Sequence, residues 1–378
     1  MKRARSLGHA NVPTVQDTDA EKRVQLKRNR DDRALRKRFY THLFPRVSDV
    51  IVDLATCGGQ FKLHQCEITM WFNIDGHDVQ KRDVVFYNAK QLCDRLAHSS
   101  PTAINLGGVF LGVLDDPKRV QERHLCTKGG AAAYGPFRVD VDIGDYAPPS
   151  CAYDVRAGIC TCAPKRVCNK CWHVVLEPGR QVLDYLLKTV MGFKCVFYVF
   201  SGRRGYHAWV LDQRVIRWTA YQRAAIIRRL QTLMWDNEGV ADEAYSILEP
   251  YFDTHLLCNK RQPFFKEWSA LEGVVHWRKL AQLKRTAVFD TLYPKFDAPI
   301  SEDVTHLIKP PLTLHPSTGN FTLTLPPPGK RANAFNPERD SLKANELSED
   351  ILQVFAAPIR AAIKEAWGKN GDEGVKKE

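Results

Sequence analysis

The stretch 137-FRVDVDIGDY-146 decides how the chain folds around its most unusual residues. Positions 137, 139, 141 and 143 are apolar, whereas the alternating positions include Asp140 and Asp142. Because alternate side chains of a strand point to opposite faces, this pattern predicts a strand with one apolar and one acidic face. Half-buried neighbouring carboxylates repel each other, and a divalent cation would relieve that repulsion. An edge strand with a solvated acidic face fits the same residues equally well.

Composition limits the class of protein. The chain has 378 residues, 44% of them hydrophobic, which suffices for one large domain or two ordinary ones. A formal net charge of +12 favours a polyanionic partner, nucleic acid first, although a solvated basic surface would give the same total. The sequence shows neither an apolar run of membrane-spanning length nor the apolar core of a secretory signal, so we expect a soluble intracellular protein.

We expect a core that is interrupted by a helical subdomain. The core covers 22–216 and 290–365, the helical subdomain covers 217–289, and the tails are 1–21, which is flexible, and 366–378, which is charged. Lys and Arg dominate 22–38, which predicts a basic helix. Such a helix is compatible with a solvated edge, a nuclear import signal or a DNA-facing role.

Hydrophobic patterning predicts the main elements. Short strands are expected at 67–74, 83–89 and 104–114, a helix at 175–193, and two strands at 195–200 and 206–211. The last two strands are apolar on both faces, which places them in the middle of a sheet. Extended structure is expected again over 292–326, followed by a charged, helical C-terminus.

The turn 201-SGRRGYH-207 concentrates ligands for phosphate. Its two glycines allow the backbone to turn tightly, while Ser201, Arg203, Arg204 and His207 supply hydrogen-bond donors. A second basic group follows in 306-HLIKPPLTLHPSTG-319, where two prolines favour extended backbone.

Extended backbone places Lys309 and His315 on one face, so that both can address one ligand. Asp297 lies twelve residues before Lys309 and is a third acid available to a metal site.

Four cysteines cluster in 160-CTCAPKRVCNKCWH-173. Four thiolates in a short loop suit a closed tetrahedral zinc site, and a fortuitous cluster of reduced thiols is the alternative. The expected zinc ligands are Cys160, Cys162, Cys168 and Cys171, with Cys151 and His173 as substitutes. The scattered single cysteines are expected to be small buried side chains.

Taken in order, these groups resemble the small catalytic subunit of eukaryotic and archaeal DNA primase, from about Arg38 to about Pro326. The resemblance implies an α/β fold, with a primase-type mixed sheet flanked by helices and a zinc knuckle at about 151–173. It implies that Asp140, Asp142 and Asp297 bind two Mg²⁺ or Mn²⁺ ions. It also implies that the incoming nucleotide is held by a larger group of residues, namely Glu67, Ser201, Arg203, Arg204, His207, Lys309 and His315.

Three positions depart from the family pattern. Thr161 separates two cysteines that are adjacent in the family, which leaves Cys160 and Cys151 both open as first zinc ligand. A family Arg in the strand after the Glu67 position aligns with Tyr87, and a ribose-contacting Asp aligns with Asn105. The choice between ribonucleotides and deoxynucleotides therefore stays open at the level of sequence.

By this resemblance the protein is a primase that makes short RNA on a single-stranded DNA template from ribonucleoside triphosphates. The implied partners are the large primase subunit and, through it, a replicative DNA polymerase, and the implied location is the nucleus, with an organelle as the alternative. The rival functions are a primase-polymerase that uses deoxynucleotides, a metal-dependent phosphodiesterase and a non-catalytic zinc-dependent nucleic-acid-binding subunit.

Overall fold

The computed structural model of the chain describes residues 32–74, 77–82, 84–110, 133–146, 166–256, 277–329 and 335–368. The strands of these residues form two sheets, of order β2-β1-β3-β4 and β5-β7-β6. The first sheet contains β1 (Cys66–Ile74), β2 (His77–Lys81), β3 (Ala103–Phe110) and β4 (Ala133–Tyr134). The second sheet contains β5 (Phe137–Asp142), β6 (Val196–Phe200) and β7 (Gly205–Val210).

The α/β class is confirmed, but the expected mixed sheet is not. Every pairing between named strands in the described ranges is antiparallel. In the β6–β7 hairpin a short turn reverses the chain, and a strand that follows such a turn can only pair antiparallel with its predecessor.

The strand expected at 83–89 is also wrong. β2 ends at Lys81, and α3 (Ala89–Ser99) begins after Asn88, whose side chain accepts a hydrogen bond from the Gln91 backbone N–H. The apolar residues between β2 and α3 do not form a strand, and Phe86 among them packs into the core with 3% of its surface exposed.

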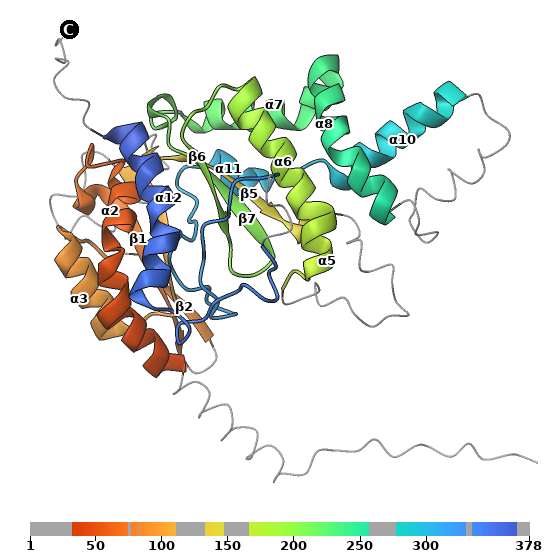
Figure 1. Cartoon of the computed structure of the whole chain (residues 1–378). Coiled ribbons are helices and arrows are strands. Elements are labelled where there is room, and N and C mark those ends of the chain that lie inside the picture. The colour runs from red at the N-terminus through yellow and green to blue at the C-terminus, as the bar shows by residue number, and fades with distance from the viewer. Residues whose placement is uncertain are drawn as a thin grey trace, which may run out of the picture.

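Helices pack against both sheets (Figure 1). Grouped with the first sheet are α2 (Ser48–Thr56), α3 and α12 (Glu349–Trp367), and α12 also contacts β6. The other α-helices are α5 (Asn169–Cys171), α6 (Glu177–Tyr185), α7 (Ala220–Asp236), α8 (Glu238–Tyr251), α10 (Trp277–Leu292) and α11 (Ala298–Glu302).

Shorter helical turns complete several of these helices. Turns of π-helix cover Phe39–Leu43, Trp172–Leu176, Leu186–Val190 and Phe252–Leu256, and 3-10 turns cover Phe44–Arg46, Leu63–Gln65, Ile143–Asp145 and Gln213–Val215. The two π turns on either side of α6 extend it, so the helix expected at 175–193 is confirmed in kind. The basic helix expected at 22–38 is described only over 32–38, where it is helical.

β7 is the central strand of its sheet, and each of its residues is buried. On the far side of β6, the Phe200 N–H donates to Leu323 O (2.8 Å) and the Leu325 N–H donates to Tyr198 O (2.8 Å). The mid-sheet position predicted for 206–211 is therefore met by β7, whereas β6 is an end strand of the sheet, and the segment around 321–325 covers its outer edge. Trp172 packs its ring against Phe200 from the helical side.

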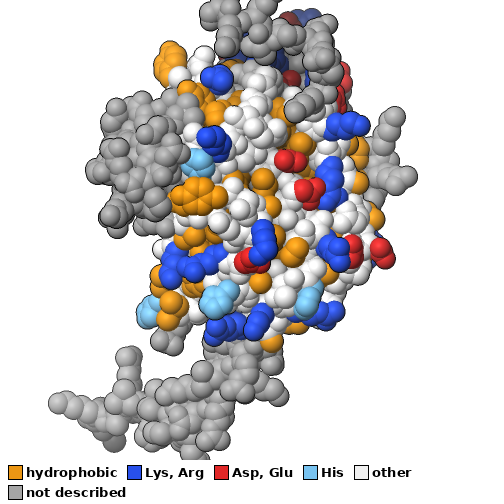
Figure 2. Space-filling view, turned by 90° about the vertical axis from the view of Figure 1, so that its left-hand side faces the viewer, with side chains coloured by type: hydrophobic (Ala, Val, Ile, Leu, Met, Phe, Trp, Pro, Cys, Tyr) orange, Lys and Arg blue, Asp and Glu red, His pale blue; other side chains and the backbone are white. Residues whose placement is uncertain are grey.

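Lys and Arg side chains are spread over the face that carries α2 and α3 (Figure 2). Some of them are compensated by acids on these helices, as in the pairs Lys90–Asp94 (2.6 Å) and Arg360–Asp49 (2.6 Å). None of the helices within the described ranges combines the length and apolarity that a membrane span needs.

A buried ion pair ties α6 to the second sheet. Arg180 donates to both carboxylate oxygens of Glu177 (2.9 and 3.0 Å) and to the carbonyl of Pro326 (2.7 Å), and both charged side chains are 1% exposed. The guanidinium also lies over the Tyr198 ring, 5.4 Å from its centroid.

We predict that Arg180→Met lowers the free energy of unfolding by about 3–5 kcal/mol, because it leaves the Glu177 carboxylate buried without its cationic partner. The double variant Glu177→Gln/Arg180→Met should regain most of that loss. Thermal and urea unfolding measure the effect. Lys90→Met is the control, because its exposed partner Asp94 stays hydrated and the unfolding midpoint should hardly change. A double variant no more stable than Arg180→Met would contradict this account.

Candidate active site

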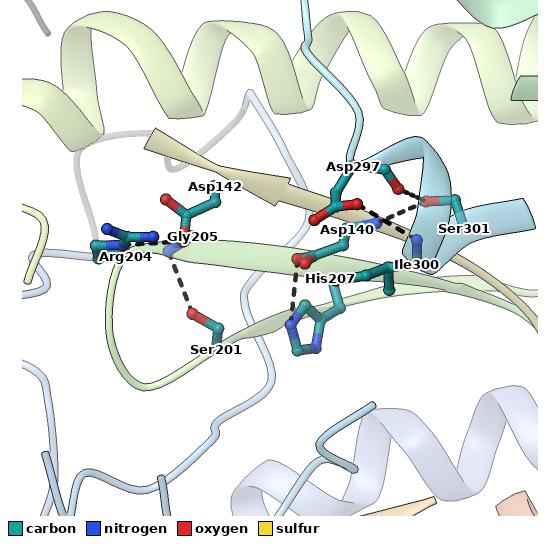
Figure 3. A network of polar contacts seen from close by, with 9 residues as sticks. All are labelled: Asp140, Asp142, Ser201, Arg204, Gly205, His207, Asp297, Ile300 and Ser301. Atoms are coloured by element: carbon teal, nitrogen blue, oxygen red, sulfur yellow. Dashed lines mark hydrogen bonds and ion pairs between the residues drawn. The ribbon is translucent and has the colours of Figure 1, made fainter. Parts of the chain in front are cut away.

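Strand register brings the acidic strand and the GRRG turn together. β5 pairs with β7 so that Asp140 lies opposite His207 and Asp142 lies opposite Gly205. His207 Nε2 lies 3.3 Å from Asp140 Oδ1, and Arg204 Nε donates to Asp142 Oδ2 at 3.1 Å (Figure 3). A Cβ at position 205 would collide with the Val141 carbonyl, so only glycine allows this close pairing.

The turn between β6 and β7 is fixed at both ends. The Gly205 N–H donates to Ser201 Oγ (3.2 Å) and the Ser201 N–H donates to Gly205 O (3.0 Å). Gly202 has a φ of 83°, in the left-handed region, and its carbonyl accepts from Thr318 Oγ1 (2.9 Å) and Asn320 Nδ2 (3.0 Å). The turn that contains His315 is thereby attached to the turn that contains Arg203 and Arg204.

Asp297 lies beside Asp140 although 157 positions separate them in the sequence. Its backbone N–H donates to the Asp140 carbonyl (3.0 Å), and Ser301 Oγ accepts from the Asp140 N–H (3.3 Å). The Asp297 carboxylate caps the short helix α11 by accepting from the Ile300 N–H (3.3 Å). The sequence stretch predicted as extended thus contains one helical turn, which docks Asp297 on β5.

The Asp140 carboxylate is largely buried, close to other negative charges. Burial, followed by the charges of Asp142 and Asp297, raises the pKa of Asp140 to about 7. Burial lowers the pKa of His207 to about 3, and the positive charges of Lys309 and Arg138 contribute in the same direction. His207 is therefore neutral at pH 7, so its 3.3 Å contact with Asp140 is not an ion pair.

The two basic residues of the 309–315 segment belong to the same electrostatic cluster. Burial lowers the pKa of Lys309, which the charges of Asp140 and Asp142 partly oppose. Burial and the neighbouring cations Lys309 and Arg203 lower the pKa of His315 to about 2. Lys309 is thus within electrostatic reach of the two acids, and His315 is within reach of Lys309 and Arg203. The backbone between Lys309 and His315 is not extended as expected, because Leu312 has a φ of 60°.

Glu67 stands apart from this cluster, on β1 of the first sheet. It is 1% exposed, one carboxylate oxygen accepts from Arg82 Nε (3.0 Å), and the other has no hydrogen-bond partner in the described part of the chain. Position 107 on the neighbouring strand must be glycine, because a Cβ there would occupy the place of the Glu67 carboxylate.

Arg82, and not Tyr87, is the residue that contacts Glu67 in the structure. Tyr87 is 49% exposed and lies against the His64 ring, whereas Arg82 is the arginine that reaches Glu67. Asn105 lies on β3 opposite Thr69. With its amide turned so that both ends find partners, the nitrogen donates to Ile104 O (2.8 Å) and the oxygen accepts from Trp71 Nε1 (3.1 Å).

Half of the predicted zinc site falls within the described residues. Cys168 and Cys171 are buried, and the Cys171 N–H donates to Cys168 Sγ (3.4 Å) in a one-turn helix. Cys160, Cys162 and Cys151 lie outside the described residues. His173 is half-buried, and burial lowers its pKa.

The acids are at present engaged by protein groups. Asp142 accepts from Arg204 and from the Gly144 N–H (2.7 Å), while Asp297 serves as a helix cap. Across the described ranges, no three His, Cys, Asp or Glu side chains are already arranged to hold a metal ion.

Sequence reasoning missed three groups that build the site. Ser301 joins Asp297 to Asp140, Asn320 joins the turn that contains His315 to the turn that contains Arg203, and Arg82 pairs with Glu67. Ser301 and Asn320 act through partners far away in sequence, so local pattern carries no signal for them. For Arg82 the one available signal was an arginine directly after a short strand.

Comparison with known proteins agrees with the geometry. The family described as DNA primase small subunit matches residues 139–325. The chain is similar to the DNA primase small subunit of Saccharomyces cerevisiae, with 24% identity over 361 residues, which covers 79% of this chain and 83% of that protein.

Two further relatives extend this similarity. The DNA primase small subunit of Schizosaccharomyces pombe is 24% identical over 69% of this chain and 66% of its own length. DNA primase small subunit PriS of Thermococcus onnurineus is 23% identical over 80% of this chain and 88% of its own length. The chain belongs to the DNA primase small subunit family, the family of the catalytic nucleotidyltransferase subunit of primase.

Proposed function

We propose that this protein synthesises short RNA primers on a single-stranded DNA template from ribonucleoside triphosphates. One observation carries the proposal: the β5–β7 register places the acidic pair within contact of the turn that holds Arg203 and Arg204. Carboxylates that bind divalent ions, next to cationic groups that bind a triphosphate, are the requirements of nucleotidyl transfer.

The carboxylates of Asp140, Asp142 and Asp297 fit Mg²⁺ or Mn²⁺. They are hard oxygen donors, and they lie close enough to one another to raise the pKa of Asp140, so positive charge is favoured between them. Two bound ions would activate the attacking 3′-hydroxyl and neutralise the triphosphate. Arg204 would exchange Asp142 for a phosphate oxygen, which frees that carboxylate as nucleotide arrives.

The remaining residues bind and orient the nucleotide in this proposal. Arg203 and Lys309 attract the triphosphate by their charge, and the low dielectric of a half-buried site strengthens that attraction. Ser201 and the neutral imidazole of His315 contribute hydrogen bonds to it. The neutral imidazole of His207 holds the Asp140 carboxylate in place. Supporting this arrangement, the hydrogen bonds to Gly202 fix the position of the His315 turn against the Arg203 turn.

We assign Glu67 and Arg82 to a wall of the nucleotide site next to Asn105. The buried Glu67 oxygen that lacks a partner is an acceptor available to a ligand hydroxyl. An amide at Asn105 can donate as well as accept, so it retains a hydrogen-bonding group where the family has a carboxylate.

The proposal includes a structural zinc, partners and a location. Cys168 and Cys171 would be two of the four zinc ligands, with Cys162 and either Cys160 or Cys151 as the others. The chain would act with the large primase subunit and, through it, with a replicative DNA polymerase, in the nucleus. Support for the large subunit comes from the name of the relatives, each of which is called a small subunit.

We predict that Asp140→Asn stabilises the metal-free protein at pH 8 by about 1–3 kcal/mol, because it removes a buried, repelled charge. The sign follows from the raised pKa: the folded state resists ionisation of Asp140, so wild-type stability is lost as pH rises from about 4 to about 7. The gain should therefore fade toward pH 4. Melting in EDTA measures it.

Asp236→Asn is the control for this experiment, since Asp236 is an exposed acid paired with Arg229, and its effect should stay within about 1 kcal/mol. Adding Mn²⁺ should stabilise the wild type and leave Asp140→Asn unchanged. Equal responses of wild type and Asp140→Asn to Mn²⁺ would contradict the metal assignment.

For Asp297→Asn we predict intact folding and a loss of primer synthesis by about a hundredfold or more. Asparagine caps a helix as well as aspartate does, so α11 should stay docked, while the charge that holds the ion at the 3′-hydroxyl is gone. Nucleotide binding should remain near the wild-type affinity. Synthesis above about a tenth of the wild-type rate in saturating Mg²⁺ would mean that the third ligand lies elsewhere.

The function itself is tested by incubating the protein with single-stranded DNA, Mg²⁺ or Mn²⁺, and either ribonucleotides or deoxynucleotides. We expect template-dependent products of short RNA. Deoxynucleotide extension alone would indicate a primase-polymerase, and cleavage of DNA without synthesis a phosphodiesterase. Binding of DNA without any chemistry would indicate a non-catalytic zinc subunit.

A further inference from the structure

Arg138 lies on the same face of β5 as the two acids, two residues before Asp140. Exposure falls along this face, from 28% for the Asp142 side chain and 16% for the Asp140 side chain to 4% for Arg138. Arg138 is thus the buried end of the strip of charged residues that contains the candidate active site.

The guanidinium of Arg138 makes its hydrogen bonds to backbone carbonyls. It donates to Leu106 O (3.4 Å), Val304 O (3.0 Å) and His306 O (3.2 Å) and lies over the Trp209 ring, 6.0 Å from its centroid. In the described part of the chain no ion pair joins Arg138 to a carboxylate. Burial lowers its pKa to about 10, so the side chain is still charged at pH 7.

A buried charge without a paired acid lowers the stability of the fold, and an apolar residue of similar size would fill the same space without that cost. The hydrogen bonds to three carbonyls give a reason for an arginine at this position. They come from two segments that are distant in sequence, so one planar side chain with several donors joins both segments to β5.

Both segments lead to proposed nucleotide ligands. Val304 and His306 lie between Asp297 and Lys309, and Leu106 exchanges two backbone hydrogen bonds with Ile308 (2.8 and 2.9 Å), the residue before Lys309. Leu106 also precedes Gly107, whose missing side chain makes room for Glu67.

We infer that Arg138 is a positioning residue for nucleotidyl transfer: its carbonyl contacts hold the 304–308 segment so that Lys309 faces the triphosphate and Asp297 faces Asp140. This role rests on the function proposed above. It is distinct from the ligand roles, because Arg138 itself contacts neither ion nor nucleotide.

The chain offers a matched control in Arg223. Its guanidinium is 1% exposed and also donates to carbonyls, those of Gly135, Pro136, Val215 and Trp218. Burial lowers its pKa to about 9. Arg223 joins α7 to the start of β5 and makes no hydrogen bond to the 304–308 segment, so its loss should cost stability alone.

The test compares Arg138→Met and Arg138→Lys with Arg223→Met and Arg223→Lys in primer synthesis, with rates divided by the folded fraction. Arg138→Met should lower kcat/KM for the nucleotide by about ten- to a hundredfold, through a higher KM and a lower kcat, because misplaced ligands weaken binding and alignment together. Arg138→Lys keeps the charge but loses the planar fork, so an intermediate loss is expected. Both Arg223 variants should stay within about twofold.

Hydrogen exchange gives a readout that needs no activity and remains usable if Arg138→Met fails to fold. In nucleotide-free protein, Arg138→Lys should speed exchange of the Ile308 amide, which donates to Leu106 O, by about tenfold, while Arg223→Lys should not. Wild-type exchange and wild-type kinetics in Arg138→Lys would overturn the inference. So would equal losses of kcat/KM in the Arg138 and Arg223 variants. A wild-type protein that makes no primers would instead overturn the proposed function.

Discussion

The pairing of β5 with β7 is the constraint on which the rest of the site depends. It holds Asp140 opposite His207 and Asp142 opposite Gly205, so the two carboxylates of β5 lie beside the arginine-containing turn that leads into β7. The close approach at Gly205 leaves no room for a side chain, and a shift of one residue would move both acids to the opposite face. Two further parts of the site are attached to this unit. Helix α11 is held by the Asp140 backbone, and the turn that contains His315 is held by the Gly202 carbonyl.

Such a site is electrostatically costly for the folded chain. Three acids lie near one another, His207 is kept neutral by burial, and the cations around them are only partly solvated. Binding of divalent ions and a triphosphate would balance these charges, so in our account the site is arranged for its ligands rather than for stability. Other parts of the fold offset this cost. They are the buried ion pair of Glu177 and Arg180 and the apolar core around β7.

Sequence reasoning reached the parts of the fold that local pattern determines. The alternation of apolar and acidic residues predicted β5, because alternate side chains of a strand face opposite sides. The two glycines before β7 predicted a tight turn, and Gly202 has a positive φ there. Asp297 was already a candidate third acid, and the resemblance joined it to Asp140 and Asp142, because no local pattern connects positions so far apart. What escaped depends on contacts across the chain: the antiparallel pairing of both sheets, the pairing of Arg82 with Glu67, and the carbonyl contacts of Arg138.

The central claim is that the acids of β5, Asp297 and the basic turns form a single site for ions and nucleotide. Anomalous diffraction from crystals grown with Mn²⁺ and a non-hydrolysable ribonucleoside triphosphate tests it most directly. We predict manganese peaks bounded by the carboxylates of Asp140, Asp142 and Asp297, with the triphosphate against Arg203, Arg204 and Lys309. Manganese and nucleotide bound together at another place, with the Asp142–Arg204 pair unchanged, would contradict the account.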